Sequence, residues 1–404
     1  MTSPNRTVAN GGSVAEVRAL IRAHATPLPP EPIPLAAAAG RVLRETIVAP
    51  EDQPPFTRSA VDGYAVRLDD RSEWFRIVDT LRAGDWRPRA LATGEAVRIA
   101  TGAALPSGGL QVLMKEDVEL LGENVRTPGR TPARHLRERG EDVRQGQPVL
   151  SAPARLSAGM LGLLASVGAA APVVSRLPRT IHVATGNEIV PPEQTPEHGQ
   201  IRDSNSSLVR GFLAGHGIAP EQHRAPENYD AALALLGHAT PDLLLISGGA
   251  SVGEFDFTGR LLADLGYEVL LSKTATRPGK PLIFARRGDA LAFGLPGNPL
   301  AHFVCLHLFV DEALHAMAGL PPRNPFELGT LAAELEADGN ARETLWPARW
   351  SLENGRAVVT PLRWMSSGDL SSLAAANGLI RVAAGAGRLA RGATVEFAPT
   401  PSLP

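Results

Sequence analysis

The spacing of apolar residues changes along the chain and divides it into segments of different secondary structure. Apolar positions recur at helical spacing over 13–25. The proline-rich stretch 27–34 that follows excludes a regular helix and predicts an extended connector. From about 48 to 142 the pattern changes to short alternating runs interrupted by Gly, Pro and Asp. This pattern predicts a small β-rich domain.

Residues 179–318 alternate apolar runs of strand length with segments of helical period. Such alternation predicts a parallel sheet with helices on both faces. After a linker at 319–329, the runs LWPARWSL and AVVTPL predict a second small β domain in the tail. The pattern therefore predicts a multidomain protein built from α/β and β domains.

Residues 156–174 carry no charge over almost the length of a membrane span. The stretch is rich in Ala, Gly and Ser and contains Pro172, so it is less apolar than a spanning helix. We predict instead a short buried helix that ends at Gly168, followed by a strand through Val173 and Val174. The N-terminus lacks the apolar core of a signal peptide, and a cytoplasmic protein without membrane contact is expected.

Composition narrows the class of protein further. At 404 residues the chain is long enough for two to four domains, and its formal charge of −2 with no basic run argues against a nucleic-acid partner. Cys305 is the only cysteine, so a disulfide within the chain is excluded and a cysteine-based metal site is disfavoured. His302, Cys305 and His307 lie in an apolar run, which favours a packed helix over a metal site.

The candidate chemistry is concentrated in residues 243–300, in the stretches LLLISGGASVGEFDFT, KTATRPGKPLIFA and FGLPGNPLA. Each joins an apolar run to a Gly- or Pro-rich loop, which can bring backbone N–H groups close to an anion. Two of the three lysines in the chain, Lys273 and Lys280, lie with Arg277 in the second stretch. These features predict a site for a phosphorylated ligand, although the first loop alone could be a plain strand–helix turn. The candidate ligand-binding residues of that loop are Ser247, Gly248, Gly249, Ser251 and Gly253.

Another loop, TGNE at 185–188, ends a further predicted strand of the same sheet. Loops at the carboxyl ends of parallel strands converge, so Glu188 and Asp256 are expected to share a Mg²⁺ ion with phosphate oxygens. Two unrelated surface acids are the alternative. The motifs RPGKP and LPGNP predict rigid loop walls, although Pro-Gly pairs are also common in ordinary turns. Asp62 before Gly63 is typical of a turn, and its spacing alone indicates no function.

Taken together, these motifs resemble those of the molybdopterin molybdenumtransferase family, which includes bacterial MoeA and the E-domain of gephyrin. The matching segments, in the family's order over roughly 14–320, are PPFTRSAVDGYAVR, RIATGAALP, HLRERGEDV, LLASVG, TGNEIV, GQIRDSNSSLV, SGGASVGEFDFT, RPGKP and GLPGNP. A weaker match, SSGDLSSLAAANGLI, lies near the C-terminus.

The resemblance implies four domains and a homodimer. It assigns 1–47 with 143–178 to an elongated central domain used for dimerisation, and 48–142 to an inserted β-rich domain. It assigns 179–320 to an α/β molybdopterin-binding domain like MogA, the adenylyltransferase, and 321–404 to a C-terminal β-barrel. The active site is then expected between the α/β domain of one subunit and the inserted domain of the other.

The family reaction converts adenylylated molybdopterin and molybdate into molybdenum cofactor and AMP. For this chain the resemblance implies Mg²⁺ as cofactor, molybdate as co-substrate, and transient contact with a molybdopterin adenylyltransferase and with recipient molybdoenzymes. The catalytic residues that it implies are Asp62, Thr101, Glu188, Asp256, Lys273 and Arg277, with Asp62, Glu188 and Asp256 as metal ligands. The substrate-binding residues that it implies are Arg137, Asp142, Gly186, Ser247, Gly248, Gly249, Ser251, Gly253, Lys280, Pro296, Gly297, Asn298, Pro299 and Ser367.

The chain departs from the family pattern at three positions. Asn228 replaces one of a pair of acidic residues, Pro347 stands at a usual Arg, and Ser366 replaces the usual Gly before Ser367. Two alternatives are weighed against the transferase. An adenylyltransferase would share the α/β domain, but residues 1–178 argue against it. A dimeric scaffold without catalysis is disfavoured by the retained charged residues, although the departures keep this alternative open.

Overall fold

The chain forms two compact units. The computed structural model describes residues 9–106, 108–129, 133–225, 228–249, 257–366 and 368–400. We call the first unit, which comprises 33–39 and 45–172, the insert unit. The second, the α/β–barrel unit, comprises the described parts of 1–32, 40–44 and 173–404. The four-domain boundaries implied by the resemblance stay a prediction.

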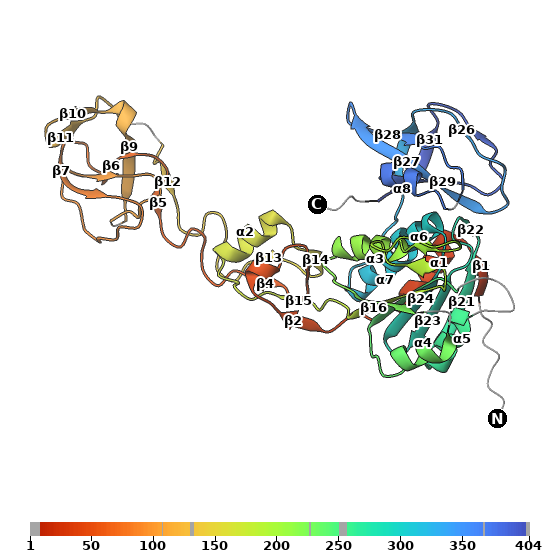
Figure 1. Cartoon of the computed structure of the whole chain (residues 1–404). Helices are drawn as coiled ribbons and strands as arrows, with labels where there is room; N and C mark the ends of the chain where they lie inside the picture. Colours follow the sequence, from red (N-terminus) through yellow and green to blue (C-terminus); the bar gives the residue numbers. More distant parts are fainter. Residues whose placement is uncertain are drawn as a thin grey trace. The chain divides into compact units, whose positions relative to one another are not determined.

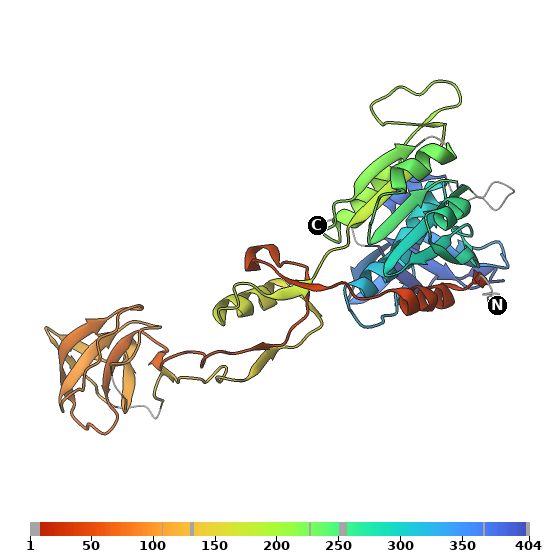
Figure 2. The same cartoon turned by 90° about the horizontal axis from the view of Figure 1, so that it is seen from below.

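A six-stranded sheet forms the body of the insert unit, with the strand order β10-β11-β7-β8-β6-β9 (Figure 1). Its strands, coloured orange in Figure 2, are β6 (Gly63–Arg67), β7 (Trp74–Leu81), β8 (Glu95–Ile99), β9 (Leu110–Met114), β10 (Glu119–Leu121) and β11 (Asn124–Arg126). Phe75, Leu81, Ile99 and Leu110 of these strands are fully buried. The alternating runs of the sequence thus form strands, as predicted.

Helix α2 (Ala158–Ser166) belongs to the same unit. It begins after Ser157, whose hydroxyl accepts a hydrogen bond from the N–H of Met160. The helix is predicted, but its predicted burial is wrong, because Leu164 is the only buried residue among its nine. The helix packs against the short 3₁₀ turn η1 (Leu35–Ala37), which is too small to cover its apolar surface.

A seven-stranded sheet organises the α/β–barrel unit, with the order β1-β21-β23-β24-β20-β16-β19 (Figure 1). Its strands are β1 (Ala9–Gly12), β16 (Thr180–Thr185), β19 (Glu221–Ala225), β20 (Leu243–Ser247), β21 (Glu268–Thr274), β23 (Ile283–Arg287) and β24 (Ala290–Leu295). The sheet is mixed rather than all parallel, because β23 runs antiparallel to both neighbours. The cause is the two-residue connection 288–289 between β23 and β24, since a connection this short joins only antiparallel strands.

Strand β20 is buried on both faces. Leu243 and Leu245 belong to one hydrophobic cluster, to which α1, α3, α6 and α7 contribute. Leu244 and Ile246 belong to a second cluster, to which α4 and α5 contribute. A strand buried in this way is a continuous apolar run rather than an alternating one. The helices are α1 (Val14–His24), α3 (Asn205–Ala214), α4 (Tyr229–Leu236), α5 (Phe257–Asp264), α6 (Pro299–Cys305) and α7 (Asp311–Met317).

The helical run Pro299–Met317 joins α6, the π-helical turn η3 (Leu306–Val310) and α7. Its length and apolarity would suit a membrane span, but 78% of its apolar window is buried inside the protein, as in the core helix of a folded domain. His302 and Cys305 are fully buried in it. Among the described residues no group of three His, Cys, Asp or Glu side chains could hold a metal ion. The prediction of a packed helix is therefore confirmed.

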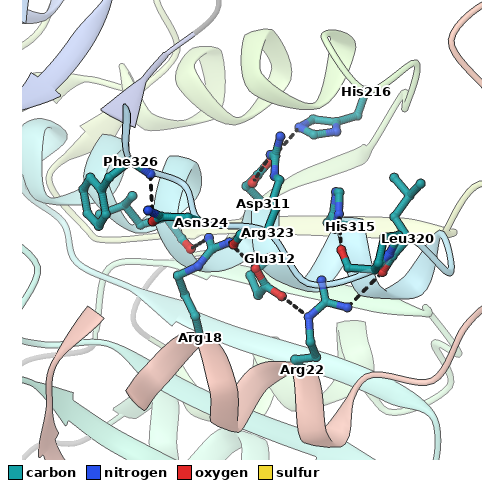
Figure 3. Close-up of polar contacts among 12 residues, drawn as sticks. Arg18, Arg22, His216, Asp311, Glu312, His315, Leu320, Arg323, Asn324 and Phe326 are labelled. Carbon is teal, nitrogen blue, oxygen red and sulfur yellow. Dashed lines mark hydrogen bonds and ion pairs between the residues drawn. The ribbon is translucent and has the colours of Figure 1, made fainter. Parts of the chain in front are cut away.

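Helix α1 is held to α7 by buried charges. Arg18 and Arg22 of α1 both form ion pairs with the carboxylate of Glu312 (Figure 3). Beside them, Arg323 donates to Asp311 at 2.7 Å. We call these five residues the Glu312 cluster. The cluster ties the N-terminal helix to the segment that leads into the C-terminal barrel.

The C-terminal region forms a closed five-stranded barrel, which confirms the expectation from the resemblance. The strands pair in the ring β25-β28-β27-β29-β31, and β31 pairs back to β25. The short strand β22 (Thr276–Arg277), which leads into the RPGKP segment, pairs with β27 and so brings that loop beside the barrel. The barrel strands are β25 (Glu327–Leu331), β27 (Glu343–Glu353), β28 (Arg356–Pro361), β29 (Gly378–Val382) and β31 (Thr394–Pro399).

Candidate active site

The loops that follow β16, β20 and β24 line a pocket of about 620 Å³ at the carboxyl edge of the seven-stranded sheet. We call it the glycine-loop pocket. Loops at this edge converge because the three strands are parallel to one another. The residues predicted from the sequence that line it are Glu188, Ser247, Gly248, Gly249, Pro296, Gly297, Asn298 and Pro299.

Glycine is required where two of these loops touch. Gly248 has a φ of 92°, and a Cβ at this position would lie 2.4 Å from the carbonyl oxygen of Thr185. A Cβ on Gly186 would lie 2.6 Å from Oε2 of Glu188. A larger residue at either position would therefore force the loops or the Glu188 carboxylate to move.

Glu188 lies exposed at the wall of the glycine-loop pocket. Its carbonyl oxygen accepts a hydrogen bond of 2.8 Å from the N–H of Ile201, which fixes the backbone. No hydrogen bond or ion pair joins its carboxylate to another described residue. An exposed carboxylate without a partner, on a backbone that is fixed, is suited to bind a cation together with ligand oxygens.

A second pocket, of about 380 Å³, shares Pro281, Pro296 and Asn298 with the first. The RPGKP loop forms one side of it and the barrel region forms the other. We call it the cationic pocket, because three basic side chains line it. Its charged and aromatic lining residues are Arg277, Lys280, Arg342, Glu336, Asp338, Trp346 and Trp364.

Arg277 is held in the cationic pocket by two contacts. Its guanidinium pairs with Asp338, and the hydrogen bond from Arg277 keeps the pKa of the Asp338 carboxyl below its usual range. The same guanidinium lies 5.2 Å from the centre of the Trp364 ring, which is packed edge-on against Trp346. The indole N–H of Trp364 is buried and has no hydrogen-bond partner among the described residues.

The two lysines of the KTATRPGK segment lie in different places. Lys280 is exposed and lines the cationic pocket. Its backbone is fixed, because its carbonyl oxygen accepts from Thr274 N at 2.9 Å. Lys273, in β21, lines neither pocket. The structure therefore brings Lys280 and Arg277 together and leaves Lys273 apart.

Asp62 and Thr101 are brought together in the insert unit. Oδ1 of Asp62 accepts from the N–H of Thr101 at 2.8 Å and from its hydroxyl at 2.9 Å. Lys115 lies 3.4 Å from Oδ2. The hydrogen bonds from Thr101 lower the pKa of Asp62, with a smaller contribution from Lys115. Asp62 is thus a half-exposed, ionised carboxylate in a fixed orientation.

The remaining predicted residues of the insert unit lie on its surface. Arg137 donates a 2.6 Å hydrogen bond to Glu141, and this interaction raises the pKa of Arg137. The N–H of Asp142 donates to the carbonyl oxygen of Gln53 at 2.9 Å.

Four predicted site residues lie outside the described residues: Ser251, Gly253, Asp256 and Ser367. Reasoning from the sequence missed Lys115, Asp338, Arg342 and Trp364 as site residues. For Lys115 a signal existed, since it is one of three lysines. The other three come from the barrel region, where no motif identified them. A basic, aromatic-walled pocket beside a glycine-rich one defines an anion-binding protein of the α/β class.

Comparisons with known proteins identify the family. The model described as "MoeA N-terminal region (domain I and II)" matches residues 12–168, "Probable molybdopterin binding domain" matches 181–316, and "MoeA C-terminal region (domain IV)" matches 329–400. The molybdopterin molybdenumtransferase of Bacillus subtilis is 32% identical over 88% of this chain and 86% of its own. That of Staphylococcus epidermidis is 29% identical over 92% of this chain and 91% of its own.

A solved structure agrees with this family assignment. The molybdopterin biosynthesis MoeA protein of Pyrococcus horikoshii superposes with a TM-score of 0.82 at 27% identity, covering 97% of this chain and 100% of that chain. The chain belongs to the molybdopterin molybdenumtransferase family, and it is an enzyme of the transferase class.

Proposed function

We propose that this protein inserts molybdate into adenylylated molybdopterin and releases AMP, the metal-insertion step of molybdenum cofactor biosynthesis. The observation that carries the proposal is the pair of adjoining pockets, which share Pro281, Pro296 and Asn298. One pocket is glycine-rich and the other is basic. A transferase that joins an organic phosphate ligand to an inorganic oxyanion needs two such neighbouring sites.

The glycine-loop pocket is suited to the organic substrate. Gly248 and Gly249 have positive φ values and allow the backbone to approach a ligand closely. The N–H groups of such a loop can surround a phosphate without a side chain in between. Its volume of about 620 Å³ lies in the usual range for a small-molecule site.

The cationic pocket is suited to molybdate, a tetrahedral dianion. Lys280 and Arg277 supply positive charge, and the buried indole N–H of Trp364 supplies a donor that needs an acceptor. Arg277 is held by Asp338 and Trp364 before the oxyanion arrives, so its charge can stabilise negative charge during the transfer.

Mg²⁺ fits the carboxylate at the pocket wall. Mg²⁺ commonly takes one or two protein carboxylates and completes its shell with phosphate oxygens and water. Glu188 has the free oxygens for this, and Asp256, the second predicted ligand, follows the same glycine loop. Bound there, the ion would neutralise the pyrophosphate of the substrate. Glu188 would hold the ion at the wall of the glycine-loop pocket.

The insert unit would complete the site in a homodimer. Asp62 is held as a carboxylate by Thr101 and Lys115, and an oriented carboxylate can bind metal or orient water. Arg137 and Asp142 would border the same cleft in the partner subunit. The apolar side chains of α2 are only partly covered, with Leu164 alone buried, and this supports an association between subunits. A cytoplasmic location, and transient contact with the adenylyltransferase and with recipient enzymes, complete the proposal.

The test is AMP release from purified protein supplied with adenylylated molybdopterin, Mg²⁺ and molybdate. We expect release to depend on molybdate, and we expect Glu188→Gln to raise the Mg²⁺ concentration needed for half-maximal rate. Glu193→Gln, an exposed acid that lines neither pocket, is the matched control. AMP release that is independent of molybdate would contradict the proposal.

A further inference from the structure

A chain of hydrogen bonds runs from the surface of α3 through the interior of β16 to the glycine-loop pocket. His182 of β16 is fully buried, and its Nε2 lies 2.6 Å from Oγ of Ser247. Its Nδ1 lies 3.1 Å from the side-chain nitrogen of Gln222. Ser247 ends β20 and lines the pocket. None of the candidate motifs in the sequence includes His182.

The direction of each hydrogen bond in this chain follows from its outer end. Arg210 contacts Oε1 of Gln222 through Nε at 2.9 Å and through Nη2 at 2.6 Å. A guanidinium can only donate, so the oxygen of the Gln222 amide faces Arg210. The amide nitrogen then donates to the carbonyl oxygen of Ser206 at 2.9 Å and to Nδ1 of His182.

His182 is therefore a neutral imidazole with a defined tautomer. Since Nδ1 accepts from Gln222, the ring proton is on Nε2 and is donated to Ser247. Burial lowers the pKa of His182 to about 3, with a smaller effect from His302, so the ring stays neutral at physiological pH. Oγ of Ser247 accepts this hydrogen bond, and its own hydrogen must point elsewhere.

The wall of the pocket offers no described acceptor for that hydrogen. A second buried group there is also incomplete. Asn205, only 8% exposed, donates to the carbonyl oxygen of Gly297 at 2.8 Å, while its Oδ1 has no partner among the described residues. A buried polar atom without a partner costs free energy unless a ligand or water satisfies it. Ser247 and Asn205 both line the pocket, and they are left with a hydroxyl hydrogen and an amide oxygen that no described residue satisfies.

We propose that His182 is a positioning residue, which holds Ser247 as an obligatory hydrogen-bond donor to the organic substrate in the glycine-loop pocket. This proposal rests on the proposed function and adds to it a residue with no place in the family motifs quoted from the sequence. The acceptor on the substrate is an oxygen or a ring nitrogen, since both bind a hydroxyl donor. The effect of His182 on binding passes through Ser247 alone.

A double-mutant cycle tests this. The dissociation constant of adenylylated molybdopterin is measured for the full-length protein and for His182→Phe, Ser247→Ala and the double variant. We expect each single variant to weaken binding about tenfold, because one oriented hydrogen bond is lost. The double variant should bind no more weakly than either single variant, because both changes remove the same donor. Independent tenfold losses that multiply in the double variant would overturn the proposal.

Two further measurements separate this outcome from a general loss of structure. His182→Gln keeps a donor towards Ser247 and an acceptor towards Gln222, and we expect it to recover most of the affinity. The KM for molybdate should stay unchanged in all these variants, because Ser247 does not line the cationic pocket. Wild-type protein that binds no adenylylated molybdopterin would refute the proposed function. Wild-type binding that His182→Phe leaves unchanged would refute only the role of His182.

Discussion

The Glu312 cluster and the cationic pocket both contain arginine–carboxylate pairs, but these pairs serve different purposes. In the cluster, Glu312 is 2% exposed and receives two guanidinium groups, from Arg18 and Arg22 (Figure 3). In the cationic pocket, Arg277 is 31% exposed and Asp338 is 57% exposed. Both pair an arginine with an acid distant in sequence.

The two sites differ in which charged and polar groups remain available to a ligand. A carboxylate buried between two arginines has no approach for a ligand, and its removal would leave charges stranded in the core. In the cationic pocket, Lys280 and the Trp364 indole N–H have no described partner, and water can reach Arg277. Charges that are buried and paired are structural, whereas exposed and incompletely paired charges are available for binding.

The largest effect is expected from breaking the buried cluster. Glu312→Ala should lower the free energy of unfolding by about 3–5 kcal/mol, because Arg18 and Arg22 lose their shared partner in the core. Chemical denaturation of the full-length protein measures this loss. Glu334→Ala, which removes the partner of the exposed Arg388, is the matched control and should change stability little. Equal losses of unfolding free energy in the two variants would contradict the distinction between buried, structural charges and exposed ones.

In the cationic pocket the same kind of change should affect binding instead of folding. Lys280→Ala should raise the KM for molybdate about ten- to hundredfold, because an exposed cation that lines the pocket is lost. The melting temperature should stay close to that of the wild type. Arg391→Ala, an exposed barrel cation that lines neither pocket, is the control for net charge. Loss of stability without a change in KM would show that Lys280 is structural.

The sequence could predict the glycine-loop pocket, but neither of the two sites compared here. The loops around Gly248 and Asn298 follow apolar runs of strand length, so their convergence at a sheet edge follows from local pattern. The Glu312 cluster joins residues about 290 positions apart in sequence, as in the Arg22–Glu312 hydrogen bond. The spacing of apolar residues along the chain does not predict such a pairing. The same holds for the position of Trp364 beside Arg277, which depends on how the barrel closes.

Errors in the predicted fold have a similar origin. The direction of β23 depends on the two-residue turn that follows it, and an apolar run of strand length carries no direction. The apolar segment of α2 is a helix, but burial depends on what packs against it, and the sequence of the segment alone does not contain that information.

The Asp338 carboxylate gives a finer test of the comparison. Asp338→Asn should lower the KM for molybdate about threefold, because an exposed ion pair is weak and its loss frees Arg277 for the oxyanion. Steady-state kinetics at varied molybdate concentration measures this change. The effect should vanish in the Arg277→Ala background, since no guanidinium is left to free. A higher KM would mean that Asp338 positions Arg277 rather than competing with the oxyanion.

Asp62 is intermediate between the buried charges of the Glu312 cluster and the exposed charges of the cationic pocket, because it is half exposed yet fully hydrogen-bonded. The pKa of Asp62 is lower in the folded protein than in the unfolded chain. Its interactions therefore stabilise the fold at a pH above the unfolded-state pKa. This stabilisation is lost as the pH falls through the folded-state pKa. Thr101→Val removes the hydroxyl donor and keeps the N–H donor, so the pKa of Asp62 should rise only part of the way to its ordinary value. Carboxyl NMR titration measures the shift, and Thr101→Ser should restore the wild-type value. A pKa unchanged by Thr101→Val would assign the effect to the backbone N–H of Thr101 and to Lys115 instead of the hydroxyl.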